Sequence, residues 1–157
     1  VVRMGLQCAF GGPMFPPPKP RRLLDLLMRF KEIGVERLAL CDTAGRAAPG
    51  GLTKVLDLLG RELSGVELGL HLHGQPKQLR ANLEAAWKGR VDWLDTSLNG
   101  RGGCPFLPGK PPANLPTLWM VDYMAKKGLK PDLDINKLFS ASLILERILS
   151  RKAISMT

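Results

Sequence analysis

Short apolar runs alternate with helix-like patterns along most of this 157-residue chain. Four of the runs have the length and composition of strands that are buried on both faces. They are Leu6–Phe10, Arg37–Asp42, Glu67–His73 and Val91–Leu98. Their first residues fall roughly 25 to 31 residues apart, about the length of one strand-plus-helix repeat. This spacing predicts successive βα units, and therefore an α/β fold with a parallel sheet.

The segments between and after these runs carry apolar residues at helical spacing. Helices are expected at 23–33, 52–63, 78–88, 114–127 and 138–149. The proline-rich segment Gly11–Pro20 is expected to be a long loop over the end of the first strand. A complete (β/α)₈ barrel takes roughly 250 residues. Four units therefore predict a half-barrel or a small open sheet, with an extra C-terminal helix.

The composition is that of a globular protein, with 45% hydrophobic and 24% charged residues. The net charge of +9 favours anionic partners. The basic residues are scattered, however, which is typical of a solvated surface, and no nucleic-acid-binding motif is present. No apolar stretch approaches the ~20 residues that span a bilayer. Neither nucleic acid nor a membrane is therefore expected as a partner, and three cysteines indicate a reducing compartment.

His71-Leu72-His73 holds the only two histidines of the chain. On a strand, residues two apart point to the same face, so both imidazoles are expected to project together from the strand's C-terminal end. Neutral imidazole is a common metal ligand, and this spacing suits one divalent ion. The alternative is a pair of histidines that are simply satisfied by hydrogen bonds.

Polar residues are also expected at the ends of the neighbouring strands, where parallel α/β folds bind their ligands. They are Gln7, Asp42, Thr96, Ser97 and Asn99. We expect them to converge with the histidines on one site. Asp42 has an equally good alternative role as a helix N-cap or turn residue.

A glycine-rich loop, Asn99–Pro105, surrounds Cys104 with three glycines and a proline. A thiol on such a tightly turning loop can act as a general acid or base or as a nucleophile. It could instead be a bystander in the turn. Cys8 and Cys41 lie within apolar runs and are expected to be buried in strands. The residues alone favour Asn114 as the N-cap of the fourth helix.

Together these motifs resemble, in order and over nearly the whole chain, the C-terminal half of 3-hydroxy-3-methylglutaryl-CoA lyase, a metal-dependent (β/α)₈ barrel. The matching segments are Val2-Arg3, Cys8–Gly11, Asp42–Gly45, Pro49-Gly50, His71–His73, Ala81-Asn82, Gly100–Phe106 and Asn114-Leu115. The loop Gly100-Arg101-Gly102-Gly103-Cys104-Pro105 is specific to the lyase, and the related Claisen-type synthases generally lack it. The resemblance implies a single partial barrel domain, 1–157, without the N-terminal half.

The resemblance also implies an activity, the retro-aldol cleavage of a 3-hydroxy-3-methylglutaryl thioester to acetyl-CoA and acetoacetate. It implies that His71, His73 and Asn114 bind Mg²⁺ or Mn²⁺, with His71 also counted among the catalytic residues. Cys104 would handle a proton of the enolate, and Asp42 would lie beside the substrate. Acyl-CoA is then the expected ligand, in the cytoplasm or the mitochondrial matrix.

This chain departs from the family at several positions. The Arg-Asp pair of the family's first barrel strand, whose Asp is a metal ligand, falls in the half that this chain lacks. Gly74 follows the second histidine where the family has an acid. We therefore expect the chain to be inactive without the missing half, and to self-associate or pair with that half through its open sheet edges. The alternative is a non-catalytic half-barrel that binds CoA-like anions or a partner chain.

Overall fold

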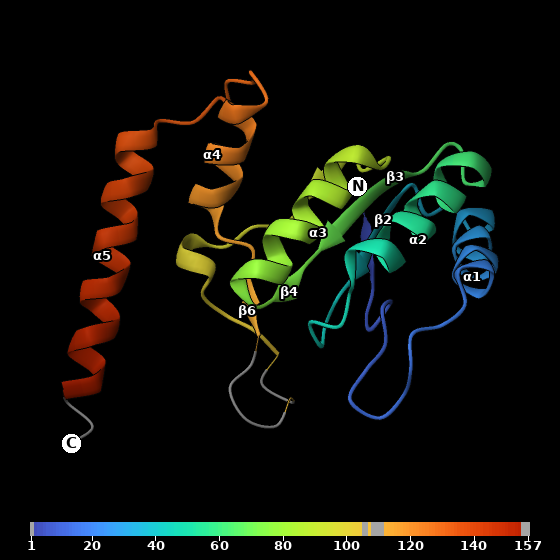
Figure 1. Ribbon diagram of the computed structural model, residues 1–157, viewed down its shortest axis with the longest axis horizontal. Helices are drawn as coiled ribbons and strands as arrows, with labels where there is room; N and C mark the ends of the chain where they lie inside the picture. Colours follow the sequence, from blue (N-terminus) through green and yellow to red (C-terminus); the bar gives the residue numbers. More distant parts are fainter. Residues whose placement is uncertain (1, 105–106, 108–111, 155–157) are drawn as a thin grey trace. The chain divides into compact units, whose positions relative to one another are not determined.

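The structure, a computed structural model, describes residues 2–104, 107 and 112–154, without the side chains of 151–154 (Figure 1). The expected motif residues Pro105 and Phe106 lie outside the described residues. The chain divides into two compact units. The first comprises residues 1–95 and 102–114, and the second comprises 96–101 and 115–157.

Four parallel strands form the sheet of the first unit, in the order β1-β2-β3-β5. Their bounds are β1 Arg3–Leu6, β2 Arg37–Cys41, β3 Glu67–His71 and β5 Trp93–Leu94. The order in space is the order along the chain, as expected for consecutive βα units. The predicted parallel α/β arrangement is therefore confirmed.

Three helices lie side by side along this sheet, with α2 between α1 and α3 (Figure 1). Their bounds are α1 Pro20–Glu32, α2 Pro49–Glu62 and α3 Pro76–Lys88. Each begins with proline, whose fixed φ suits the first helical turn and whose missing N–H removes no helical hydrogen bond there. Leucines of the three helices and of β2 and β3 are buried and form the core.

The two faces of the sheet differ, because alternate residues of a strand point in opposite directions. Leu38 and Leu40 of β2 belong to one face and are fully buried. The other face carries the row Gly5, Ala39, Gly69 and Trp93 at matching register positions. The Trp93 ring lies directly on Gly69, where an added Cβ would come within 2.1 Å of it. The small residues of this row therefore make room for one large ring.

The first strand was predicted at Leu6–Phe10 and lies earlier, at Arg3–Leu6. The reason is Cys8, whose φ of 54° is incompatible with an extended strand. The Cys8 N–H donates to Thr43 Oγ1 at 2.8 Å, outside any strand ladder. Cys8 is consequently a half-buried turn residue and not the buried strand residue that we expected, whereas Cys41 is buried in β2 as expected.

The predicted strand Glu67–His73 is two strands that are separated at Leu72. β3 ends at His71, and the short β4, His73–Gly74, pairs antiparallel with β6, Ala113–Asn114. Asn114 is therefore not the N-cap of the fourth helix, which begins three residues later. The predicted strand Val91–Leu98 is likewise shortened, to Trp93–Leu94.

The second unit contains a 3₁₀ turn η1, Leu98–Gly100, and the helices α4, Thr117–Lys126, and α5, Ile135–Ile154. α5 is longer than the expected 138–149. Asn99 joins η1 to α5, since its amide donates to Ser142 O at 3.1 Å and to Glu146 Oε1 at 2.7 Å. Arg101 forms an ion pair with the same glutamate. Among the described helices, none has the length and apolar character to cross a bilayer.

Candidate functional site

His73 is buried, and two main-chain carbonyls fix its ring. Its Nδ1 lies 3.1 Å from Asp42 O and 3.2 Å from Thr43 O. A carbonyl oxygen can only accept, so Nδ1 must carry the proton that it donates to them. Whenever the ring is neutral, Nε2 is therefore the nitrogen with the free lone pair, the form in which imidazole binds a metal.

His71 is held in a similar way by a carboxylate. Its Nδ1 lies 3.2 Å from Asp95 Oδ2, which again leaves Nε2 as the free lone pair. Burial lowers the pKa of His71 below its ordinary value, and His73 lowers it further, although Asp95 opposes both effects. The two ring centroids are 4.7 Å apart with planes at 80°. The structure thus brings the two imidazoles together as the sequence predicted, although they lie in different strands.

Asn114 is the direct cross-strand partner of His73 in the β4–β6 pair. Directly opposed residues of an antiparallel pair share one face, with Cβ atoms about 4.5–5.5 Å apart. Asn114 is also buried. Gly102, with φ of 100°, approaches it so closely that an added Cβ would lie 2.7 Å from Asn114 Nδ2. An amide side chain thus lies beside the histidine pair, against the start of the Cys104 loop.

Asp42 is fully buried at the end of β2. Its Oδ1 accepts the Arg46 N–H at 2.7 Å and closes the turn that precedes α2. Its Oδ2 is buried without a hydrogen-bond partner. Burial raises the pKa of this carboxyl above its ordinary value, opposed by main-chain hydrogen bonds and by His73. The expected turn role is therefore real, and it leaves one carboxylate oxygen for another use.

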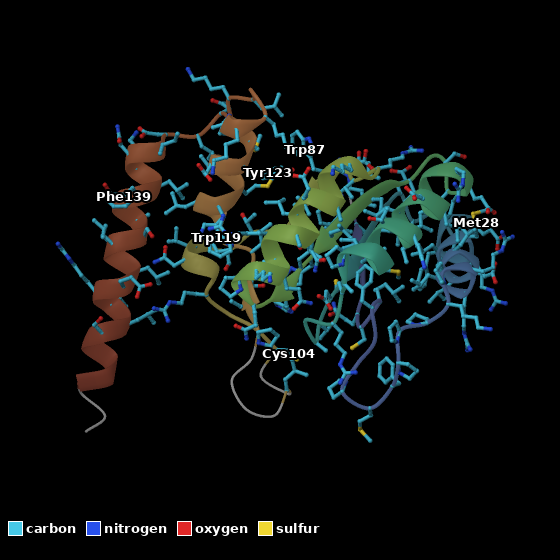
Figure 2. All side chains as sticks on the ribbon, in the orientation of Figure 1. Met28, Trp87, Cys104, Trp119, Tyr123 and Phe139 are labelled. Carbon is cyan, nitrogen blue, oxygen red and sulfur yellow. The ribbon has the colours of Figure 1, made fainter. Side chains whose placement is uncertain are left out.

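Cys104 is half-buried in the loop that leads to β6 (Figure 2). A pocket of about 310 Å³ lies next to this loop, and Gly74, Gln78 and Leu107 are among the residues that line it. Gly74 directly follows His73, and the Leu107 N–H donates to Cys104 O at 3.3 Å. The strand that carries His73 and the loop that carries Cys104 therefore border the same pocket. Within the described residues, no hydrogen bond joins Cys104 to either histidine.

The other polar residues expected at the strand ends divide between the two units. Gln7 hydrogen-bonds to Thr43 at 2.9 Å and to Cys41 Sγ at 3.5 Å, so it ties the end of β1 to the end of β2. Thr96, Ser97 and Asn99 belong to the second unit. Their side chains form hydrogen bonds within that unit, and Thr96 pairs with Thr117 there. These three residues therefore bond within the second unit, whereas the two histidines belong to the first.

Asp95 is a site residue that the sequence reasoning missed. It receives the His71 Nδ1–H, and it also forms an ion pair with Arg3 at 3.1 Å. The strand was expected to run to Leu98, so Asp95 fell inside it, whereas β5 ends at Leu94 and leaves Asp95 at a strand end like Asp42. Among the described residues, no cluster of three or more His, Cys, Asp or Glu side chains could hold a metal ion. The described donor set is therefore two imidazoles and one amide.

The sheet, its helices and the histidine pair define a chain built like part of a (β/α)-barrel enzyme. The family described as HMGL-like matches residues 1–144. The chain therefore belongs to the HMGL-like family.

Two curated relatives show the extent of the match. Human mitochondrial hydroxymethylglutaryl-CoA lyase is 29% identical over 154 residues, which are 98% of this chain and 47% of the relative. Rat cytoplasmic 3-hydroxy-3-methylglutaryl-CoA lyase is 27% identical over 140 residues, 89% of this chain and 40% of the relative. The chain thus spans about half the length of the curated relatives it matches.

Solved structures give the same picture. The HMG-CoA lyase of Bacillus subtilis superposes with a TM-score of 0.84 at 28% identity, over 94% of this chain and 49% of that one. The HMG-CoA lyase of Acinetobacter baumannii, in complex with coenzyme A and 3-methylmalate, gives 0.80 at 27% identity, over 93% and 48%. The expected half of a TIM barrel is confirmed, and the protein is lyase-like in family.

Proposed function

We propose that this chain provides one half of a divalent-metal-dependent lyase that cleaves a 3-hydroxy-3-methylglutaryl-CoA-type thioester to acetyl-CoA and acetoacetate. The observation that carries the proposal is the histidine pair. His71 is the last residue of β3, and His73 is the first residue of β4. Both rings are held through Nδ1, so Nε2 is the available nitrogen in each. This is the arrangement that metal-binding histidines have in proteins. The lyases among the relatives supply the choice of reaction.

In this proposal His71, His73 and Asn114 hold Mg²⁺ or Mn²⁺. Two imidazoles and an amide oxygen suit Mn²⁺ better than Mg²⁺, which prefers an all-oxygen set. The buried, unpartnered Oδ2 of Asp42 is a further acceptor beside His73. When bound, the ion would polarise the hydroxyl and carboxylate oxygens of the substrate and favour loss of the hydroxyl proton. A set without a direct carboxylate ligand predicts weak binding by this chain alone.

The chain's own groups then account for the proton movements. Cleavage breaks the bond between the hydroxyl-bearing carbon and the carbon next to the thioester, and the bond's electron pair passes to a thioester enolate. In this proposal Asp42 is beside the substrate and its carboxylate takes the proton that the hydroxyl loses as that oxygen becomes the ketone of acetoacetate. Because burial raises the pKa of Asp42, it holds this proton more readily than an exposed carboxyl would. The Cys104 thiol delivers a proton to the enolate carbon, and the product is acetyl-CoA.

A second half of the barrel completes the site. In the described sheet, β1 and β5 each have a strand on one side only. Such open edges pair readily with other strands. We propose that a further set of βα repeats, or a second copy of this chain, covers them. Two of the relatives are named as mitochondrial and cytoplasmic enzymes, and either compartment suits a chain of this kind.

The metal assignment is tested by titrating the purified chain with Mn²⁺ and following free Mn²⁺ by electron paramagnetic resonance. His71→Ala and Asn114→Ala are expected to lose binding. Asn82→Ala is the matched control, because Asn82 is also a buried amide but donates to Ala47 O at 2.8 Å on the helix side. Equal binding by wild type and His71→Ala would remove the metal assignment.

The activity is tested by following acetoacetate release from 3-hydroxy-3-methylglutaryl-CoA in the presence of Mn²⁺. The chain is assayed alone and together with the N-terminal half of a related lyase. We expect turnover only with that half, and its loss in Cys104→Ala. Metal binding without turnover in either mixture would favour a non-catalytic half-barrel. Sedimentation of the chain as a stable monomer would contradict the proposed pairing.

A further inference from the structure

Four side chains on one face of the sheet form a continuous chain of contacts that ends at His71. The Arg3 guanidinium lies over the Trp93 ring, with Cζ 4.2 Å from the centroid. Its Nη1 and Nη2 donate to the two oxygens of Asp95 at 3.1 and 3.4 Å. Asp95 Oδ2 in turn accepts the His71 Nδ1–H at 3.2 Å.

The contact between Arg3 and Trp93 crosses the width of the sheet. Arg3 lies in β1 and Trp93 in β5, with β2 and β3 between them. Neighbouring strands are about 4.8 Å apart, so the two edge strands of a flat sheet would be separated by roughly 14 Å. Side chains from both edges meet because the Trp93 ring extends over Gly69 and Arg3 lies on the same face of the sheet. The Arg3–Trp93 pair thus spans the face of the sheet that carries Gly5, Ala39 and Gly69.

Trp93 provides the aromatic ring on which the Arg3 guanidinium stacks. Its ring rests on Gly69, whose missing side chain leaves the necessary space. A guanidinium that stacks on an aromatic face keeps its edge available for a carboxylate. A guanidinium bonded through two nitrogens also fixes the rotation of that carboxylate, which one hydrogen bond would not do. Asp95 is thereby held with one oxygen facing His71.

We propose that Arg3 and Trp93 are positioning residues for His71, acting through Asp95 to keep its proton on Nδ1 and its Nε2 lone pair directed toward the ligand site. The inference rests on the proposed function for what His71 binds, but its structural content concerns this chain alone. It assigns a role to Trp93, which lies two residues before Asp95 and opposite Gly69. Partners of a ligating histidine typically contribute 10- to 100-fold to metal affinity.

The experiment is long-range ¹H–¹⁵N correlation on the ¹⁵N-histidine-labelled chain at pH 8.5, without metal. The chain has only two histidines, so His71→Ala assigns both sets of signals. In the wild type we expect both rings as the Nδ1–H tautomer. In Arg3→Met and Trp93→Leu, the His71 signals are expected to shift toward the Nε2–H tautomer that free imidazole prefers, while the His73 signals stay. Trp93→Phe, which keeps an aromatic face, is expected to restore the wild-type pattern.

Arg37→Met is the matched control, because Arg37 is the register partner of Arg3 and forms an ion pair with Glu67 at 2.6 Å. It should leave both tautomers unchanged. Arg3→Lys keeps the positive charge but lacks the planar pair of donor nitrogens, so it should show a smaller shift in the same direction. It takes the place of Arg3→Met in the experiment if that variant does not fold. In parallel Mn²⁺ titrations, Arg3→Met and Trp93→Leu are expected to weaken binding about tenfold or more.

Three results would overturn the inference. They are a proton on Nε2 of His71 in the wild type, an unchanged tautomer in both folded variants, or an equal change in Arg37→Met. Absence of Mn²⁺ binding by the wild type with the expected tautomers would contradict the proposed function and support the positioning role. The two failures are therefore distinguishable.

Discussion

Gly102 and Asn114 approach so closely that a Cβ on the glycine would lie 2.7 Å from the amide nitrogen of the asparagine. Gly102 also has a φ of 100°, which residues with a side chain rarely adopt. The glycine therefore has two separate functions, one in the turn and one in the placement of Asn114. Since Asn114 faces His73 across the β4–β6 pair, the loop and the histidine pair are mechanically connected.

Gly102→Ala is accordingly expected to destabilise the protein and to disturb the histidine site. Gly34→Ala is the control, because Gly34 has a φ of 87° but nothing within 4 Å of its Cβ position. Backbone strain alone costs about 1–2 kcal/mol of unfolding free energy in both variants. The clash adds about 1–3 kcal/mol in Gly102→Ala only. Urea denaturation measures both values, and equal losses would show that the loop moves aside.

Gly69→Ala is expected to be strongly destabilising although Gly69 has an ordinary backbone conformation. The new Cβ would lie 2.1 Å from the Trp93 ring, so the ring must leave its place. We expect a loss of about 1–3 kcal/mol, the usual cost of overpacking. A double-mutant cycle with Trp93→Leu checks the cause, because the smaller side chain should relieve the clash. Additive losses would contradict this explanation.

Cys41 is expected to resist alkylation in the native protein. Its side chain is buried in β2, and burial raises the pKa of its thiol to about 11. Only the thiolate attacks an alkylating agent, so at pH 8 the reaction should be confined to the half-buried Cys8 and Cys104. Mass mapping after iodoacetamide treatment tests this, with the chain in urea as the control in which all three react. Equal rates for Cys41 in the two conditions would be inconsistent with its burial.

Asp42→Asn is expected to change how stability depends on pH. Because burial raises the pKa of Asp42 in the folded state, the folded chain retains a proton at pH values where the unfolded chain has lost it. The wild type therefore loses stability as pH rises from the unfolded pKa, about 4, through the folded pKa. Asparagine does not titrate, so the stability difference in its favour should grow between pH 4 and pH 8.

Urea denaturation of the metal-free chain at both pH values measures this change. Asp57→Asn is the control, because Asp57 is an exposed carboxyl on α2. A difference between wild type and Asp42→Asn that shrinks toward pH 8 would contradict the burial argument. A difference in unfolding free energy that is the same at both pH values has a separate cause, the hydrogen bonds of the new amide group.

The sequence by itself determined the repeat, the parallel order of the strands and the position of the histidines. These features depend on local patterns, namely leucines at helical spacing and apolar runs of strand length. The convergence of strand ends then follows from the parallel sheet alone. Asp42 and the two histidines could for this reason be assigned to one edge before any contact was known.

Only the tertiary structure decided which atoms these residues use. The residues around Asn114 predict that it is a helix N-cap. It is a strand residue instead, because the distant segment His73–Gly74 pairs with it. The tautomer of His71 depends on Asp95, and the position of Asp95 depends on Arg3, 92 residues earlier in the chain. The free energies of such contacts are comparable to the local helix and strand propensities of the residues. The residues that form the contacts do not recur at a regular spacing. The contacts therefore leave no pattern in the sequence and are seen only when the strands are assembled and side chains from distant segments meet.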